Sequence, residues 1–225
     1  SLLMAAVGIA VIPQLDQAKG DRAKMDIGNI NNALKTFYAK KGSYPDTGGG
    51  LKALVDVAKR FGEVKIVAPD HERSACGHSM TMRRPLRVWG VEWEGADAYE
   101  VDGVPVDCVN VGLTVAWPDG CDLLLSGINN GPNLGFDITY SGTCAGAMEG
   151  AINGIKSISL SMANFVTGAP LHLDTGKRWL DENFEMLVRA PHKPLTFLNV
   201  NVPAVDYTEL RGHRFVTMGK RVYED

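Results

Sequence analysis

The hydrophobic and polar positions of the 225-residue chain follow two different patterns, and the change between them falls near Gly50. Between Ile27 and Phe37, apolar residues recur at spacings of three and four with polar residues between them, which predicts a long amphipathic helix. Gly42 and Pro45 are typical of the end of such a helix. Beyond Gly50, continuous apolar runs alternate with helical patterns, as in a parallel α/β sheet.

The region after Gly50 predicts strands and helices in alternation. Expected strands cover residues 64–70, 121–126, 157–162 and 195–203, and expected helices cover residues 51–62, 105–116, 141–155 and 174–189. Residues 85–93 and 98–103 predict paired strands, a β-hairpin excursion from a mostly parallel sheet with right-handed crossovers. We therefore expect two domains, a helix and turn over residues 1–50 and an α/β domain over residues 51–225.

The first thirteen residues are almost entirely apolar. This run is shorter than the roughly 20 residues that cross a bilayer, and no basic residue precedes it as in a signal peptide. We therefore expect no membrane span in this chain, although the run could be the inner half of a longer apolar helix.

Composition and charge argue against several classes of function for this chain. The net charge is −3 and the pI is about 6.0, which argues against binding to a nucleic-acid duplex. The four cysteines contain no C-x-x-C pair, so neither a zinc site nor a disulfide framework is indicated. Reduced thiols suit a cytoplasmic protein.

Two loops that follow predicted strands carry residues suited to a ligand, because ligands of open α/β sheets bind beyond the carboxyl ends of the strands. The loop after residues 121–126 is rich in glycine and asparagine, and Ser141, Gly142 and Thr143 then open a helix. The first N–H groups and the dipole of a helix attract phosphate. From this loop alone, a well-capped helix without a ligand is the simpler interpretation.

Both loops together resemble the SurE family, also called survival protein E. The resemblance covers residues 51–225 and rests on five motifs in the family's order: VAPDHERSACGHSMTMRRPLRV, VDGVPVDCV, LLLSGINNGPNLG, YSGT and LNVNVP. It implies a Rossmann-like fold and a metal-dependent 5′/3′-nucleotidase that hydrolyses nucleoside monophosphates. Family members form homodimers or tetramers, with help from a protruding hairpin. This chain stops short of the segment that supports such assembly in the family, which puts the dimer in doubt.

The resemblance also implies roles for individual residues. It places a divalent metal, Mg²⁺ or Mn²⁺, on Ser74 and Asn129. It places the phosphate of the substrate on a pocket made by Asn133, Ser141, Gly142 and Thr143.

Three other residues near these motifs have simpler interpretations. Asp70 follows a strand, a functional location, but pairing with Arg73 or Arg83 explains it equally well. His78 is expected to be part of the loop scaffold, and Cys76 and Cys144 are expected to be small buried fillers.

The family's first strand, which ends in Asn-Asp-Asp-Gly, has no match in this sequence. Those two aspartates are the main charged ligands of the family's metal, and this chain has no adjacent Asp pair. Asp46 is single and lies too close to the following helix to align with them. Residues 1–13 could lend a replacement strand, but the helical pattern after them argues against it. We therefore expect strongly impaired hydrolysis.

Residues 2–47 are similar to a type II secretion pseudopilin, a relative of type IV pilins. The shared features are an apolar start, a polar helical continuation and the turn GSYP. Three hypotheses follow: an impaired SurE-like nucleotidase, a nucleotide- or phosphate-binding domain without catalysis, and a secretion-system subunit.

Overall fold

The computed structural model of the chain describes residues 48–71, 73, 75–93, 95–165 and 170–219. The predicted amphipathic helix lies outside the described residues, as do Asp46 and the predicted metal-binding residue Ser74. The division into domains at residue 50 therefore stays a prediction, although the first described helix begins close to it, at Gly48.

The described strands form two three-stranded sheets, in the orders β1-β3-β2 and β4-β5-β6. The second sheet is parallel throughout, whereas the first combines one parallel and one antiparallel pair. The strands are β1 (Lys65–Pro69), β2 (Val88–Trp93), β3 (Ala96–Val101), β4 (Leu123–Asn130), β5 (Lys156–Ala163) and β6 (Leu198–Pro203).

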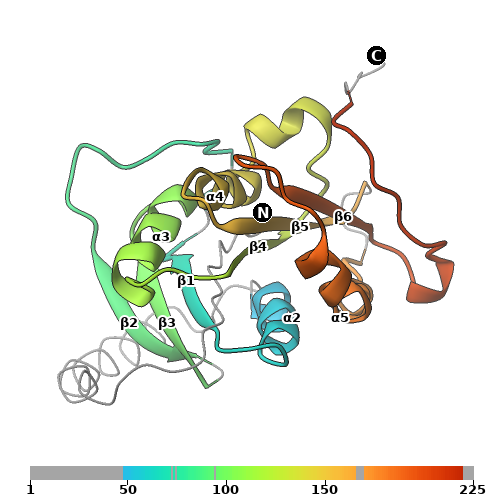
Figure 1. The fold of residues 1–225 in the computed structure, drawn as a ribbon, viewed down its shortest axis with the longest axis horizontal. Helices are drawn as coiled ribbons and strands as arrows, with labels where there is room; N and C mark the ends of the chain where they lie inside the picture. The colour runs from blue at the N-terminus through green and yellow to red at the C-terminus, as the bar shows by residue number, and fades with distance from the viewer. Residues whose placement is uncertain (1–47, 72, 74, 94, 166–169, 220–225) are drawn as a thin grey trace.

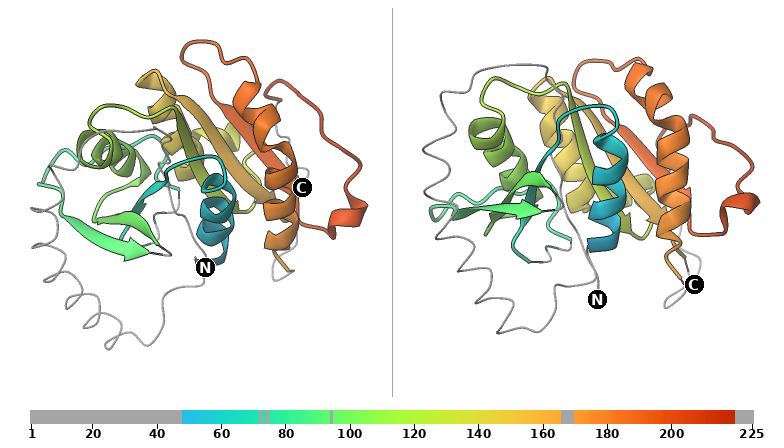
Figure 2. Two further views of the ribbon diagram at one scale, coloured as in Figure 1. Left: turned by 60° about the horizontal axis from the view of Figure 1, so that its bottom comes forward. Right: turned by 90° about the horizontal axis from the view of Figure 1, so that it is seen from below.

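Helices cover both faces of these sheets. The helix α3 packs beside α4 on one face, and α2 packs beside α5 on the other (Figures 1 and 2). Short π- and 3₁₀-helical turns extend α3 and precede α4. The helices are α2 (Gly48–Ala58), α3 (Pro105–Val111), α4 (Gly142–Ile152) and α5 (Leu173–Arg189), and the turns are Gly112–Ala116 and Gly135–Thr139.

The predicted α/β class, with a largely parallel sheet, is confirmed. The predicted hairpin differs from the structure in one respect, because only β2 is an excursion. The strand β3 pairs antiparallel to β2 and parallel to β1, with Lys65 opposite Asp97. Ala96, Ala98 and Val101 of β3 are buried. Burial of these apolar side chains stabilises β3 more in the main sheet than it would in an exposed hairpin.

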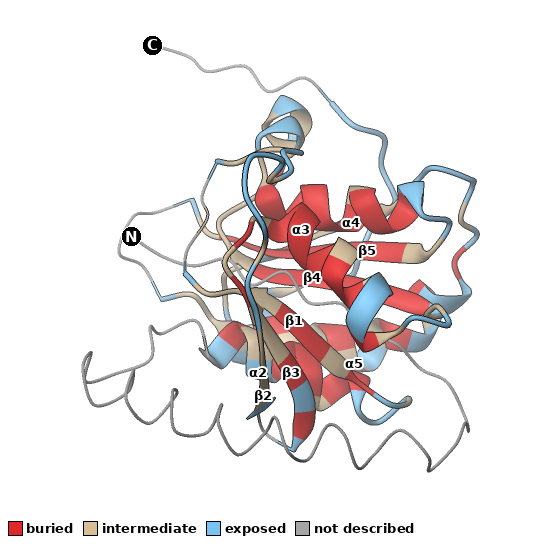
Figure 3. Cartoon of the chain, turned by 90° about the vertical axis from the view of Figure 1, so that its left-hand side faces the viewer, coloured by how far each residue is buried: buried red, intermediate tan, exposed pale blue. Residues whose placement is uncertain are grey.

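The two sheets share a single hydrophobic core. One cluster of buried side chains contains Ile66 of β1 together with Leu125 of β4 and Ile158 of β5. The helices contribute residues such as Leu54 of α2 and Leu180 of α5 to the same cluster. Figure 3 shows β4 and β5 buried almost along their whole length. The strand β4 begins with the apolar run Leu123–Leu125, whereas β5 alternates small serines with Ile158, Leu160 and Met162.

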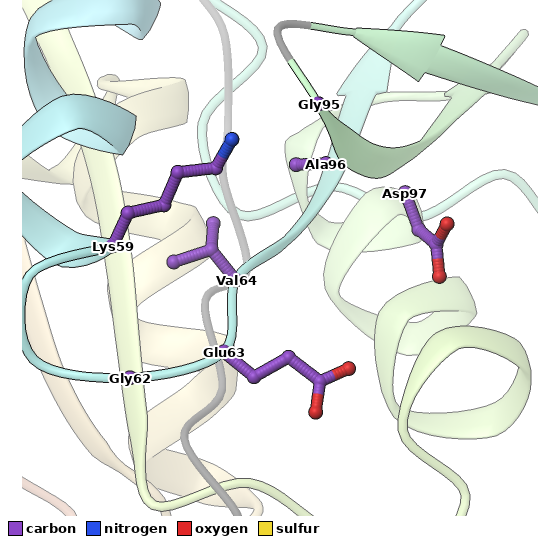
Figure 4. Close-up of a pocket in the computed structure, with 7 residues that line it drawn as sticks. All are labelled: Lys59, Gly62, Glu63, Val64, Gly95, Ala96 and Asp97. Carbon is purple, nitrogen blue, oxygen red and sulfur yellow. The ribbon is translucent and has the colours of Figure 1, made fainter.

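The carboxyl ends of β1 and β4 reach the same edge of the fold, and the amino ends of β1 and β3 reach the opposite edge. At the opposite edge lies a hollow of about 280 Å³, around which Figure 4 shows Lys59, Val64 and Ala96. The hollow is therefore remote from the loops that the sequence singles out, which lie at the carboxyl edge.

Candidate functional site

The loop after β1 and the loop after β4 meet at the start of α4. The backbone N–H of Gly77 donates to the carbonyl of Tyr140 over 3.0 Å. A Cβ atom at Gly142 would lie 3.0 Å from Cys76 Sγ and 3.5 Å from the Arg73 carbonyl oxygen. The absence of a side chain at Gly142 thus allows the amino end of α4 to touch the residues on either side of Ser74.

Ser141 begins α4 as its N-cap. Its backbone is extended, and its Oγ accepts a hydrogen bond from the N–H of Cys144 over 3.1 Å. Gly142 and Thr143 follow as the first helical residues, and both are buried. The predicted trio therefore forms a capped helix start, and the positive end of the helix dipole faces the loop after β1.

Asn129 lies near the end of β4, beside the irregularity in its pairing with β5. Its side-chain nitrogen donates to the carbonyl of Gly131 over 2.8 Å, and the residue is partly buried. Because the nitrogen makes this bond, the amide oxygen remains the atom that a cation would bind.

Asn133 is the centre of a buried polar network between the loop after β4 and the ends of β5 and β6. Its side-chain nitrogen donates to Ser161 Oγ over 2.7 Å, and its backbone N–H donates to Asn201 Oδ1 over 2.8 Å. Its carbonyl accepts from the side-chain nitrogens of Asn199, at 2.8 Å, and Asn201, at 3.1 Å. Only 5% of Asn133 is exposed, so these bonds fix the position of the loop.

Two buried carboxylates hold the loop after β1, and sequence inspection did not single out either of them. Asp107 of α3 accepts hydrogen bonds from the backbone N–H groups of Thr81 and Val104, at 3.0 and 2.9 Å. Glu149 of α4 lies 3.0 Å from the His78 ring nitrogen. Asp107 is 1% exposed and Glu149 is 7% exposed, which is unusual for carboxylates without partners. His78 therefore belongs to the loop scaffold, as expected.

A second set of charges fixes the same loop from the side of β3. Asp102 forms an ion pair with Arg84 at 2.7 Å and accepts a hydrogen bond from the N–H of Arg87 at 2.8 Å. The Arg84 guanidinium, followed by the N–H of Arg87, lowers the pKa of the Asp102 carboxyl below its usual value. Asp70 lies 3.6 Å from Arg73, so the expected pairing with an arginine is present for Arg73.

None of the four cysteines forms a disulfide in the described part of the chain. Burial raises the pKa of the Cys144 thiol and, more strongly, that of Cys108. Burial likewise raises the pKa of Cys76 and brings that of Cys121 to about 11. The thiols are therefore protonated at neutral pH, and none has the lowered pKa of a cysteine nucleophile. Cys144 is a buried filler as expected, whereas Cys76 is only partly buried.

The described residues do not fit a Mg²⁺ or Mn²⁺ site by themselves. No group of three or more His, Cys, Asp or Glu side chains placed to hold a metal occurs among them. The carboxylate next to the site, Asp70, is paired with His71 and Arg73, and Asn129 offers only a neutral oxygen. Hard divalent cations prefer several anionic oxygens, which this set does not supply.

The described helices include none that is long and apolar enough to span a bilayer.

Comparisons with known proteins agree with this geometry. The family model for Survival protein SurE matches residues 46–225, and the model for Type II secretion system (T2SS), protein G, matches residues 10–69. The 5′-nucleotidase SurE of Thermosipho melanesiensis is 42% identical over 180 residues, which cover 80% of this chain and 69% of that protein. The 5′-nucleotidase SurE of Gemmatimonas aurantiaca is 44% identical over 177 residues, covering 78% and 69%.

A solved structure of a SurE protein also matches the fold of this chain. A crystal structure of the SurE protein from Aquifex aeolicus superposes with a TM-score of 0.69 at 39% sequence identity, covering 78% of this chain and 69% of that one. The two family models overlap at residues 46–69, and the structure forms α2 and β1 from residues 48–69.

Proposed function

Because this chain belongs to the SurE family, we propose that its α/β domain binds the phosphate of a nucleoside monophosphate and hydrolyses it poorly. The observation that carries the proposal is the contact between the start of α4 and the loop after β1. A Cβ at Gly142 would lie close to Cys76 Sγ and the Arg73 carbonyl oxygen, so the amino end of α4 and the loop after β1 border the same small region. A phosphate placed there would face a helix start that attracts anions.

Several residues would contribute to phosphate binding in different ways. Ser141 caps the helix, and Gly142 and Thr143 supply the backbone at which the phosphate oxygens would dock. Asn133 is engaged with Ser161 and Asn201, so its part is to hold the loop after β4 rather than to change partners during binding. Asn129 presents an amide oxygen at the end of β4, and Ser74 would lie in the loop opposite.

Hydrolysis of a phosphomonoester transfers the phosphoryl group to water and releases the nucleoside. In the family, a bound Mg²⁺ or Mn²⁺ would offset the charge that develops on the phosphoryl oxygens. Asn129 and Ser74 are neutral, and Asp70 lies 3.6 Å from Arg73, so the described residues offer that cation no group of anionic oxygens. The weak hydrolysis that we expect is thus caused by the shortage of anionic metal ligands and not by the fold.

A phosphatase assay with AMP and Mn²⁺ tests the impairment. The Thermosipho melanesiensis relative, assayed beside this chain, is the positive control. We expect turnover at least about 100-fold lower than that of the relative, as when one charge-stabilising group is removed from an active site. Metal-dependent turnover equal to that of the relative would show that the impairment is wrong.

Calorimetry with inorganic phosphate and AMP tests binding without catalysis. Wild-type protein should release heat on titration, and Gly142→Ala should lose it, because the new Cβ would lie 3.0 Å from Cys76 Sγ and Pro105 Cγ. Gly219→Ala is the matched control, since nothing lies within 4 Å of its Cβ position. A folded wild-type sample that gives no heat at millimolar phosphate and AMP would refute the binding proposal.

We also propose that the protein is located in the cytoplasm. Four cysteines without a disulfide suit the reducing cytoplasm. Fractionation of cells that express the full chain would test this, with recovery in the cytoplasmic fraction expected.

A further inference from the structure

The loop after β1 follows a path that its own sequence does not favour. Ala75 and Gly77 both have a left-handed backbone, with φ angles of 53° and 55°. This conformation is strained for a residue with a side chain, so Ala75 keeps it only because contacts around the loop hold it there. A Cβ at Gly77 would lie 3.1 Å from the Thr139 carbonyl oxygen, so the loop also passes close to the turn before α4. The contacts that hold this path therefore shape one side of the candidate site.

Two of these contacts come from the same face of α4. Gly142 and Glu149 are seven residues apart, close to two helical turns, so they face the same way at a separation of about 10.5 Å. A Cβ at Gly142 would meet Cys76 Sγ and the Arg73 carbonyl oxygen. Glu149 lies 3.0 Å from the His78 ring nitrogen. The loop therefore runs along α4 for two turns and is held at both ends of that stretch.

Glu149 is an unusual residue for its place in α4. Its neighbours in the helix, such as Ala147 and Gly150, are small and buried, and the Glu149 side chain is itself only 9% exposed. Burial of a carboxylate is costly unless the carboxylate has partners. Its Oε2 faces the His78 ring at 3.0 Å, and its Oε1 accepts a hydrogen bond from the side chain of Asn153 over 3.4 Å. An apolar side chain would fill the same space at less cost, so the contact with His78 explains the carboxylate.

We propose that Glu149 is a positioning residue for the phosphate pocket at the start of α4. Through His78 it fixes the loop after β1 against the helix, so that this wall of the pocket is in place before the ligand arrives. The backbone N–H of Gly77, next to His78, donates to the carbonyl of Tyr140, which directly precedes the N-cap Ser141. The location of the pocket rests on the proposed function. A site that is already ordered binds more tightly, because binding does not then have to order the loop.

Amide hydrogen exchange on the full chain tests whether Glu149 holds the loop. Glu149→Met keeps a long side chain and removes the acceptor that faces His78, whereas Glu149→Gln keeps an oxygen at the same place. We expect the Gly77 amide, compared with the amides of β5, to exchange at least about tenfold faster in Glu149→Met. It should exchange as in the wild type in Glu149→Gln. Unchanged exchange of Gly77 in Glu149→Met would overturn the proposal.

Thr175→Val is the matched control for a general loss of stability. It removes the hydrogen bond from Thr175 Oγ1 to the Val205 carbonyl, which is 2.7 Å long. Thr175 belongs to α5, on the opposite face of the sheets from α4 (Figure 2). We expect the Gly77 amide to exchange as in the wild type in this variant. An acceleration equal to that in Glu149→Met would overturn the proposal, because the loop would then respond to stability alone.

A variant on the loop itself keeps the test decisive if Glu149→Met does not fold. His78→Ala removes the same contact from its more exposed partner, since the His78 side chain is 33% exposed. The same acceleration of the Gly77 amide is expected. Exchange of Gly77 at the wild-type rate in His78→Ala would overturn the proposal.

Calorimetry with inorganic phosphate separates this role from a purely structural one. The dissociation constant should rise about tenfold in Glu149→Met, as expected if the loop keeps its binding conformation about a tenth of the time. It should return close to the wild-type value in Glu149→Gln. An unchanged dissociation constant in a variant whose loop exchanges faster would overturn the positioning role. Absence of binding by the wild type would instead refute the proposed function, and the exchange of Gly77 would still decide whether Glu149 holds the loop.

Discussion

The two loops that form the candidate site are held in place by different chemistry. The loop after β4 is fixed by neutral amides and hydroxyls, through the bonds of Asn133 to Ser161 and Asn201. The loop after β1 is fixed by charges, through Asp107, Glu149 and Asp102. These three carboxylates therefore already serve as scaffold for the loop.

This difference separates binding from catalysis. A helix start and neutral amides are sufficient to hold a phosphate, because they supply N–H donors and a positive dipole. A divalent cation needs anionic oxygens that are not already paired. The proposed phosphate side of the site therefore has the groups that this task needs, whereas the described residues on the proposed cation side do not.

The largest expected effect concerns Asp107, which anchors the charged loop. Asp107→Ala removes a buried carboxylate and leaves the partly buried N–H groups of Thr81 and Val104 without their acceptor. We expect a loss of about 3 kcal/mol in the free energy of unfolding, as for removal of a buried charged partner. Urea denaturation measures it. Asp119→Ala, at an exposed aspartate, is the control and should stay within about 0.5 kcal/mol. Equal effects of the two variants would show that Asp107 does not anchor the loop.

The next effect concerns Asn133 on the neutral loop. Asn133→Ala should lower the free energy of unfolding by about 2 kcal/mol, because Ser161 loses its hydrogen-bond donor. It should also weaken phosphate binding. The backbone of residue 133 still bonds to Asn201, so Asn201→Ala removes different contacts in the same network. Urea denaturation of both variants and their double mutant should give a coupling energy above about 0.5 kcal/mol. Strictly additive effects would contradict a shared network.

The smallest effect is a pH dependence on the charged loop. Arg84 lowers the pKa of Asp102 below its usual value of 3.8. The pair therefore stabilises the fold above pH 3.8, and that stabilisation is lost as the pH falls through the lowered folded-state pKa. Arg84→Ala should raise the Asp102 pKa toward 3.8 in an NMR titration, while Arg83→Ala should not. An unchanged Asp102 pKa in Arg84→Ala would mean that the ion pair is not formed in solution.

Sequence patterns predicted much of the fold because buried strands such as β4, with its apolar run Leu123–Leu125, stand out from the polar segments around them. They did not predict that β3 joins β1, since the pairing partner of a strand depends on residues distant in sequence. Asn199 and Asn201 alternate along β6 within the LNVNVP motif, but their bonds to Asn133 could not be predicted without the fold. Glu149 gave no signal, because one carboxylate in a helix usually faces solvent.

A titration with Mn²⁺, followed by electron paramagnetic resonance in the presence of inorganic phosphate, tests whether the cation side of the site is deficient. The protein should bind phosphate by calorimetry and yet hold no Mn²⁺ more tightly than about 1 mM, a weak affinity that reflects a low number of charged ligands. A single Mn²⁺ site of micromolar affinity that is lost in Asn129→Ala would contradict the proposed deficiency. It would also show that this chain assembles the cation site from residues other than an aspartate pair.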